Sequence, residues 1–278
     1  MNNVAKSKKI TRIVFNAFAV MVMFVILFPV LWLLRNSIIE SVHVYDRPPA
    51  LFFTPTPSAY VRAFYFQHLF GRMINSIIIS IFATSLAVLL GSMAAYGVTR
   101  FHSPLNNYLP FGFLFLRMLP SICVLLPVFL MFTKMRMVDT YRGLVFIYAA
   151  GSVPTVIWMM WGFFKDLPRE IEESAYIDGV GYFGTFIKII IPITTPAFAS
   201  VGILAFTGSW NDYIMATVLT RFRTMTLPPA VVALINNTEL AWDQISAGGV
   251  VLTIPVAGLC IFAQKYFVQG LTAGAVKG

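Results

Sequence analysis

Long apolar runs separated by short polar segments dominate the pattern of hydrophobic and polar positions along this chain. A bilayer core is about 30 Å thick, so a helix crosses it with about 20 mostly apolar residues. Runs of this kind, none of which contains Asp or Glu, lie at residues 13–34, 73–99, 109–133, 144–164, 189–208 and 247–267. The pattern therefore predicts an all-α, polytopic membrane protein with six transmembrane helices.

The polar segments predict how this single transmembrane domain, residues 1–278, is threaded. The first run follows a basic tail and exceeds the apolar length of a signal peptide, with no A-x-A-like cleavage site after it, so we expect a retained helix. A basic N-terminus and an even number of spans place both chain ends in the cytoplasm. The segments are then a cytoplasmic tail at 1–12, an outer loop at 35–72, a cytoplasmic loop at 165–188, an outer loop at 209–246 and a cytoplasmic tail at 268–278.

The distribution of cations supports this orientation only weakly. The positive-inside rule predicts an excess of Lys and Arg in short cytoplasmic loops. Of the 20 Lys and Arg residues, ten fall on the predicted cytoplasmic side, and Arg117 lies within a run. The nine on the predicted outer side are Arg35, Arg47, Arg62, Arg72, Lys134, Arg136, Arg142, Arg221 and Arg223.

Composition agrees with a membrane location and excludes several classes of function. The chain is 58% hydrophobic and 11% charged, with a mean hydropathy of +0.80, whereas soluble domains are about 25% charged. Its net charge of +9 forms no basic stripe of the kind that binds nucleic acid. Cys123 and Cys260 sit within apolar runs and are expected to pack rather than to form a disulfide. Scattered histidines and the absence of hydrolase or zinc motifs predict no catalytic residue, no metal ligand and no bound cofactor, hence a non-enzymatic chain.

One polar segment departs from the rest of the pattern. Between residues 166 and 178 lie five of the chain's 11 acidic residues. The spacing of Leu167, Ile171 and Ala175 gives a narrow apolar helical stripe, and Asp178-Gly179 is a turn signal. A second apolar pattern then leads from Tyr182 into the fifth run. The segment predicts a short surface helix, a sharp turn and a returning helix; a plain solvated connection is the alternative.

The order of residues in this segment resembles the EAA signature of ABC importer permeases. That signature is Glu-Ala-Ala, three residues, Gly, nine residues and Ile-x-Leu-Pro. Here it reads Glu173-Ser174-Ala175, then Gly179, then Ile189-x-Ile191-Pro192. Ser174 and Ile191 are modest departures, and the acid, the glycine and the proline are all present. Trp210-Asn211-Asp212-Tyr213 and the C-terminal sequence 264–278 resemble further elements of the sugar-importing members.

This resemblance implies a type I ABC importer permease, similar to the second permease subunit of maltose-type systems. The implied assembly sits in a prokaryotic inner membrane and contains a second homologous permease, two ATPase subunits that bind ATP and Mg²⁺, and an extracytoplasmic solute-binding protein that delivers a carbohydrate. Alternatives remain open. An ABC permease for a glycerophosphodiester or a polyamine has a similar sequence, and a secondary transporter needs no ATPase but normally carries acidic residues within its spans.

The resemblance also implies roles for individual residues. Those expected to couple the chain to the ATPase, with the apolar stripe buried in the ATPase cleft and Glu173 paired with a base at its rim, are Glu172, Glu173, Ala175, Asp178, Gly179 and Pro192. A side chain at position 179 is expected both to clash and to resist a positive φ. An ATPase-contacting tail, with a frayed terminus as the alternative, would use Gly274, Lys277 and Gly278.

Other candidates concern the solute and its delivery. Residues considered for the substrate path, with packing as the alternative, are Arg117, Tyr148, Trp158, Trp210 and Asn211. A charge such as Arg117 within a span is costly and should face the bundle or a wet cavity. The outer segment after the fifth run is considered for contact with the binding protein through Asn237, Glu239 and Trp242.

Overall fold

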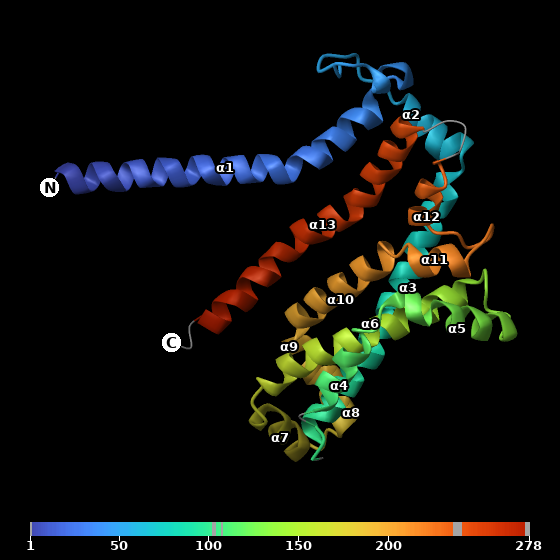
Figure 1. Ribbon diagram of the computed structural model, residues 1–278. Coiled ribbons are helices and arrows are strands. Elements are labelled where there is room, and N and C mark those ends of the chain that lie inside the picture. Colours follow the sequence, from blue (N-terminus) through green and yellow to red (C-terminus); the bar gives the residue numbers. More distant parts are fainter. Residues whose placement is uncertain (1, 102–103, 107, 236–240, 276–278) are drawn as a thin grey trace. The chain divides into compact units, whose positions relative to one another are not determined.

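The computed structural model describes residues 2–101, 104–106, 108–235 and 241–275, and its regular elements there are helices (Figure 1). Four helices are long and apolar enough to cross a membrane, or up to six if two bent helix pairs each count as one span. The four are α1 (Asn2–Ile38), α3 (Leu69–Arg100), α6 (Tyr141–Lys165) and α13 (Trp242–Ala275). The predicted all-α membrane class is confirmed.

The third predicted span is not one continuous helix. The segment 109–133 forms α4 (Leu109–Leu116) and α5 (Ser121–Lys134), which meet at 83°. Pro120 is the N-cap of α5 in an extended conformation, with φ −58° and ψ 132°. A proline there restricts the preceding residue away from helical geometry, so the helix stops before it and restarts after it. Arg117 therefore lies at a break in the helix rather than within a straight span.

The fifth predicted span is also bent. Helices α8 (Tyr182–Thr185), η3 (Phe186–Ile190) and α9 (Ile191–Ile193) form one arm, and α10 (Thr195–Trp210) forms the other, at 84° to it. Pro192 and Pro196 flank the bend at Thr194. Each proline lacks a backbone donor and crowds the preceding turn, so a pair this close favours a change of direction. The straight helix expected at 189–208 is wrong.

The two outer segments contain short helices. The first, expected as an extended connector, holds η1 (Ser41–Tyr45), α2 (Ser58–Tyr60) and η2 (Val61–Phe66). The second holds α11 (Ile214–Leu219) and α12 (Leu227–Val232). Helix α13 begins at Trp242, ahead of the predicted sixth span, and continues to Ala275, so most of the expected C-terminal tail is helical.

The chain divides into two compact units, of which the larger comprises residues 70–230 and 254–278. Helices α4 and α10 pack on α6. The main core of this unit joins Tyr96, Phe164 and Phe186 with small residues such as Ala87 and Ala149. Small residues let membrane helices approach closely. At Gly91 a β-carbon would lie 2.6 Å from a methyl carbon of Val156, so α3 and α6 need a glycine there.

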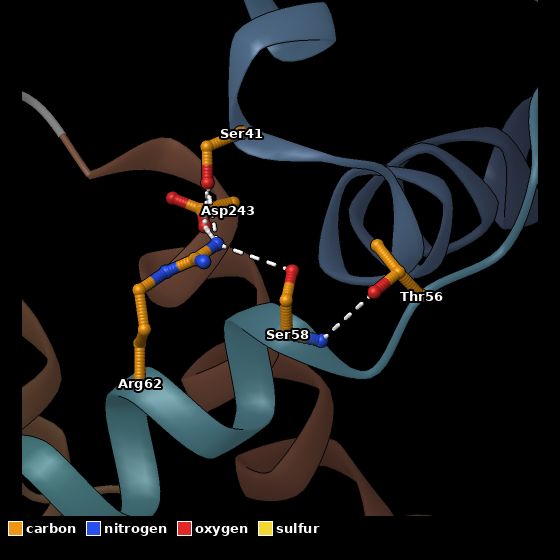
Figure 2. A network of polar contacts seen from close by, with 5 residues as sticks. All are labelled: Ser41, Thr56, Ser58, Arg62 and Asp243. Carbon is orange, nitrogen blue, oxygen red and sulfur yellow. Dashed lines mark hydrogen bonds and ion pairs between the residues drawn. The ribbon is translucent and has the colours of Figure 1, made fainter.

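The smaller unit comprises residues 1–69 and 231–253, and a polar network holds it together (Figure 2). Arg62 donates to the Asp243 carboxylate at 2.6 Å and also to the Ser41 hydroxyl, which itself donates to Asp243 at 2.8 Å. A longer bond of 3.3 Å joins Arg62 to Ser58. The network ties the 41–62 segment to the first turn of α13, over a small core that includes Ile39, Ala59, Ala63 and Ala247.

Candidate functional site

The EAA-like segment forms the short helix α7 (Glu170–Ile177), directly after α6. Its first turn carries Glu170, Glu172 and Glu173. Negative side chains at a helix N-terminus stabilise the exposed backbone N–H groups and the positive end of the helix dipole. The predicted short helix is therefore present, and its acids lie at the end where they favour helix formation.

A tight turn at Gly179 ends this helix. The Val180 amide donates to the Ala175 carbonyl at 2.9 Å, and the Gly179 amide donates to the Tyr176 carbonyl at 3.0 Å. This pair of bonds is a Schellman motif, which needs a left-handed residue at the position of Gly179. Its φ is +80°, as the sequence predicted. A β-carbon at this position would meet no atom of the chain within 4 Å, so the expected clash does not arise within the chain itself.

Glu172 points into the chain rather than toward a partner. It is 3% exposed, and its carboxylate accepts hydrogen bonds from Arg100 Nε at 2.5 Å and from the Tyr96 hydroxyl at 2.9 Å. Both donors belong to the last turns of α3. The expectation that Glu172 contacts an ATPase is wrong, because a buried carboxylate already held by two donors within the chain has no surface to offer. Its ion pair with Arg100 instead fixes α7 to α3.

The apolar stripe of α7 also faces inward. Ala175 is 3% exposed, and Leu167 packs against the main core. The stripe was expected to enter a partner's cleft, but the chain's own helices cover it. Ala175, named as a coupling residue, is likewise a packing residue. Burial of the stripe, together with the Glu172 pair, makes α7 a fixed part of the larger unit.

The opposite side of α7 is exposed and chemically mixed. Glu173, Asp178 and Gly179 are exposed, as expected of coupling residues, and Ile177 is 86% exposed. Just beyond the turn, Tyr182 and Phe183 are 58% and 63% exposed. The outer face of the segment thus combines acidic groups with large apolar side chains. Pro192, the remaining coupling candidate, is exposed and lies at the bend between α9 and α10.

The larger unit contains a cavity of about 400 Å³ near the break in the third span. Two of the path candidates, Arg117 and Tyr148, line it; Trp158, Trp210 and Asn211 do not. Arg117 donates to the Thr155 hydroxyl at 2.5 Å, so its partner is a side chain of α6. Trp210 is 1% exposed and stacks on Phe206.

Sequence reasoning missed the other polar groups that line this cavity. They are Ser121, Ser152, Ser209 and Asp212. Asp212 belongs to the quoted Trp-Asn-Asp-Tyr element and was the residue of that element with the clearest chemistry. Its carboxylate accepts the Ala216 amide at 3.1 Å, which helps to start α11.

The remaining candidates are only partly accessible to structural description. Asn237, Glu239, Lys277 and Gly278 lie outside the described residues. Trp242 is 44% exposed and begins α13, and Gly274 falls in the last turn of the same helix. Their proposed contacts with a binding protein and an ATPase stay predictions.

Comparison with known proteins places this geometry in a family. The family described as binding-protein-dependent transport system inner membrane component matches residues 87–272. The chain is 31% identical to the trehalose/maltose transport system permease protein MalG of Thermococcus litoralis, over 98% of this chain and 99% of that one. It is 34% identical to the trehalose transport system permease protein SugB of Mycobacterium tuberculosis, over 91% and 93%.

A solved structure shares the fold. A chain from a bacterial ABC transporter involved in the import of the acidic polysaccharide alginate superimposes with a TM-score of 0.76 at 22% identity, over 94% of this chain and 98% of that one. The matched family region contains the turns α7 to α9, the cavity and most of α13. The chain with the inward-anchored α7 therefore belongs to the family of binding-protein-dependent transport system inner membrane components, the non-catalytic permease subunits of ABC transporters.

Proposed function

We propose that this chain is one of two permease subunits of an ATP-driven importer and forms half of the path for a carbohydrate. The observation that carries the proposal is α7, which is anchored by burial on one side and left open on the other. Relatives named for trehalose and maltose transport align over nearly the whole chain and support a sugar as the solute.

The docking face that we assign to the ATPase consists of Glu173, Ile177, Asp178, Tyr182 and Phe183. Its large apolar side chains are mostly exposed. An apolar surface framed by charges is typical of a protein contact. A partner with a hydrophobic pocket for Ile177 and basic groups for the two carboxylates would match it. Charge-assisted hydrogen bonds of this kind contribute roughly 1.5–3 kcal/mol each.

The buried side of α7 carries the movement into the membrane. The Glu172–Arg100 pair links α7 to α3, while α6 runs directly into it. A displacement of the docking face therefore moves two membrane helices rather than a loose loop. Close packing at Gly91 makes α3 and α6 move together. ATP and Mg²⁺ would be bound by the ATPase subunits, and this chain would respond to their closure.

The same assignment orients the chain in the membrane of a prokaryote. With α7 in the cytoplasm, the Tyr141 end of α6 lies on the outer side, where a solute-binding protein would deliver the sugar. Both termini would be cytoplasmic. The cavity lined by Arg117 and Asp212 lies on the path between the two sides, against which the second permease would close.

Disulfide or maleimide cross-linking tests the proposal in the assembled importer. After replacement of Cys123 and Cys260 by Ala, we expect Ile177→Cys to form an adduct with a nucleotide-hydrolysing subunit. Ala175→Cys is the matched control: it lies in the same helix but is 3% exposed, so it should form none. Equal reactivity of the two positions, or sugar uptake that continues without any ATPase, would overturn the proposal.

A further inference from the structure

A group of cations gathers at the end of α6 opposite α7. We call Lys134, Arg136, Arg142, Arg221 and Arg223 the basic cluster. All five side chains are exposed. They come from the turn between α5 and α6 and from the segment between α11 and α12, and α11 packs beside α5 (Figure 1). Two parts of the sequence that are far apart thus contribute to one surface.

The acid nearest to these cations, Asp139, is already occupied by backbone groups. Its carboxylate accepts the amides of Arg221 and Thr224 at 3.0 Å each, the Arg223 amide at 3.2 Å and the Thr224 hydroxyl at 2.9 Å. The Asp139 amide donates back to the Leu219 carbonyl at 2.8 Å. These bonds hold the two turns together as a rigid support. Among the described residues, the ion pairs include none of the five cations.

Three guanidinium groups share one concave site. Arg136, Arg142 and Arg223 line a cavity of about 370 Å³, together with Met135, Met137, Thr140 and Tyr141. Arg136 also has a positive φ of 55°, an uncommon conformation for this residue type. Like charges that converge on a fixed frame repel one another unless an anion lies between them. The planar donor fork of arginine suits the two oxygens of a carboxylate.

The position of the cluster runs against the usual distribution of charge in membrane proteins. Cations normally concentrate in cytoplasmic loops, yet five of the nine outer cations belong to this cluster. The negative surface potential that attracts basic segments belongs to the cytoplasmic leaflet, so outer lipid is the weaker explanation. A soluble acidic partner on the outer side is the stronger one.

We infer that the basic cluster is a docking surface for the Asp and Glu side chains of the solute-binding protein. The inference rests on the proposed function, which brings that protein to this side. The arginines would each hold a carboxylate at the rim of the contact, with one acidic side chain seated in the cavity. Opposite charges across such a contact speed association and fix its orientation more than they add affinity.

Site-specific photo-cross-linking in cells tests this surface. A benzophenone amino acid replaces Met135, which is 58% exposed and lines the cavity. We expect one principal adduct, identified by mass spectrometry as a solute-binding protein. Charge reversal in the double variant Arg136→Glu with Arg223→Glu should lower its yield at least tenfold. The matched control, Arg47→Glu, reverses another exposed outer arginine and should lower it less than twofold.

Salt dependence and folding checks complete the design. Raising the salt concentration to about 0.5 M should weaken the wild-type adduct toward the level of the double variant, because screening acts on exposed charges. Normal thermal unfolding and co-purification of the complex exclude misfolding of the variant. An adduct with lipid or with the second permease, or one that is insensitive to charge reversal, refutes the docking surface. If that happens while Ile177→Cys still cross-links to the ATPase, the proposed function stands and only this inference fails.

Discussion

At the scale of single residues, Glu172 and Glu173 are neighbours in sequence with opposite environments. Successive residues on a helix point about 100° apart, so one carboxylate faces the core and the other the solvent. Glu172 has Arg100 and Tyr96 as partners within the chain, whereas Glu173 is left for a partner. The resemblance to the signature placed both in the same role, and the structure separates them.

The buried Glu172–Arg100 pair should be sensitive to the loss of either member. We expect Glu172→Gln or Arg100→Gln alone to destabilise the protein by about 3–5 kcal/mol, since each leaves an uncompensated buried charge or an unfilled donor. Tyr96→Phe removes one neutral donor and should cost about 1 kcal/mol. Thermal unfolding in detergent measures all three.

The double variant Arg100→Met with Glu172→Met provides the control for this pair. Apolar replacement of both partners removes the charges together, so it should be more stable than the sum of the two single losses. A strictly additive double variant would show that the two side chains do not interact.

Gly179 separates a backbone requirement from a partner contact. Its positive φ costs a typical residue about 1–2 kcal/mol, and Asn less. No atom of the chain lies within 4 Å of a β-carbon there. We therefore expect Gly179→Asn and Gly179→Trp to insert and unfold almost alike, but only the Trp variant to lose ATPase co-purification and uptake. Uptake by the Trp variant at the wild-type rate would contradict a close partner at this turn.

At the scale of elements, α5, α6, α11 and α12 are joined by turns rather than by helix packing alone. Asp139 is the residue that joins them, because its carboxylate accepts hydrogen bonds from the 221–224 segment. Burial by itself would raise the pKa of this carboxyl, but the hydrogen bonds from Arg221, Thr224 and Arg223 outweigh it and lower the pKa below its ordinary value.

A lowered pKa in the folded state has a definite consequence for stability. The contribution of Asp139 is fully present above the unfolded pKa of about 3.9 and is lost as the pH falls through the lower folded pKa. We expect Asp139→Ala to destabilise the protein by about 1–3 kcal/mol at pH 7, with a smaller difference from wild type at pH 3. Asp139→Asn keeps one acceptor and should show a gap that does not titrate near this pKa. A pH-independent difference for the Ala variant would contradict this account.

The same scale explains the bent spans. Hydrophobic length alone cannot distinguish a straight helix from two helices meeting at 83° or 84°. The prolines at 120, 192 and 196 were visible in the sequence, and each favours a break. Membrane helices tolerate proline where neighbours satisfy the freed backbone groups, so the choice between a kink and a break depends on what packs around it.

At the scale of the whole molecule, sidedness is the property that joins the two proposed surfaces. Helix α6 separates α7 from the basic cluster, so the two must face opposite sides of the membrane if α6 crosses it. In a chain with Cys123 and Cys260 replaced, an impermeant maleimide should label Phe222→Cys in intact spheroplasts. It should label Ile177→Cys only after permeabilisation. Both positions are 86% exposed, which makes them a matched pair. Labelling of both from outside would rule out the proposed threading.

Much of this protein follows from its sequence alone. The apolar runs determine a helical membrane protein, because backbone groups in lipid must be satisfied within a helix. Local signals determine the short acidic helix and the left-handed turn at Gly179, since helix dipoles and φ preferences act over a few residues. The spacing of the EAA-like motif was sufficient to indicate the family.

Only the tertiary structure decided which face of α7 is free. The stripe of Leu167, Ile171 and Ala175 predicts an apolar face but not what covers it, and the chain's own core supplies the cover. Arg100 lies 72 residues from Glu172 along the chain, so no local pattern pairs them. The basic cluster likewise depends on Asp139 bringing together two turns more than 80 residues apart. Periodicity and propensity act between near neighbours, whereas burial, ion pairing and the gathering of charge depend on contacts that only the folded chain creates.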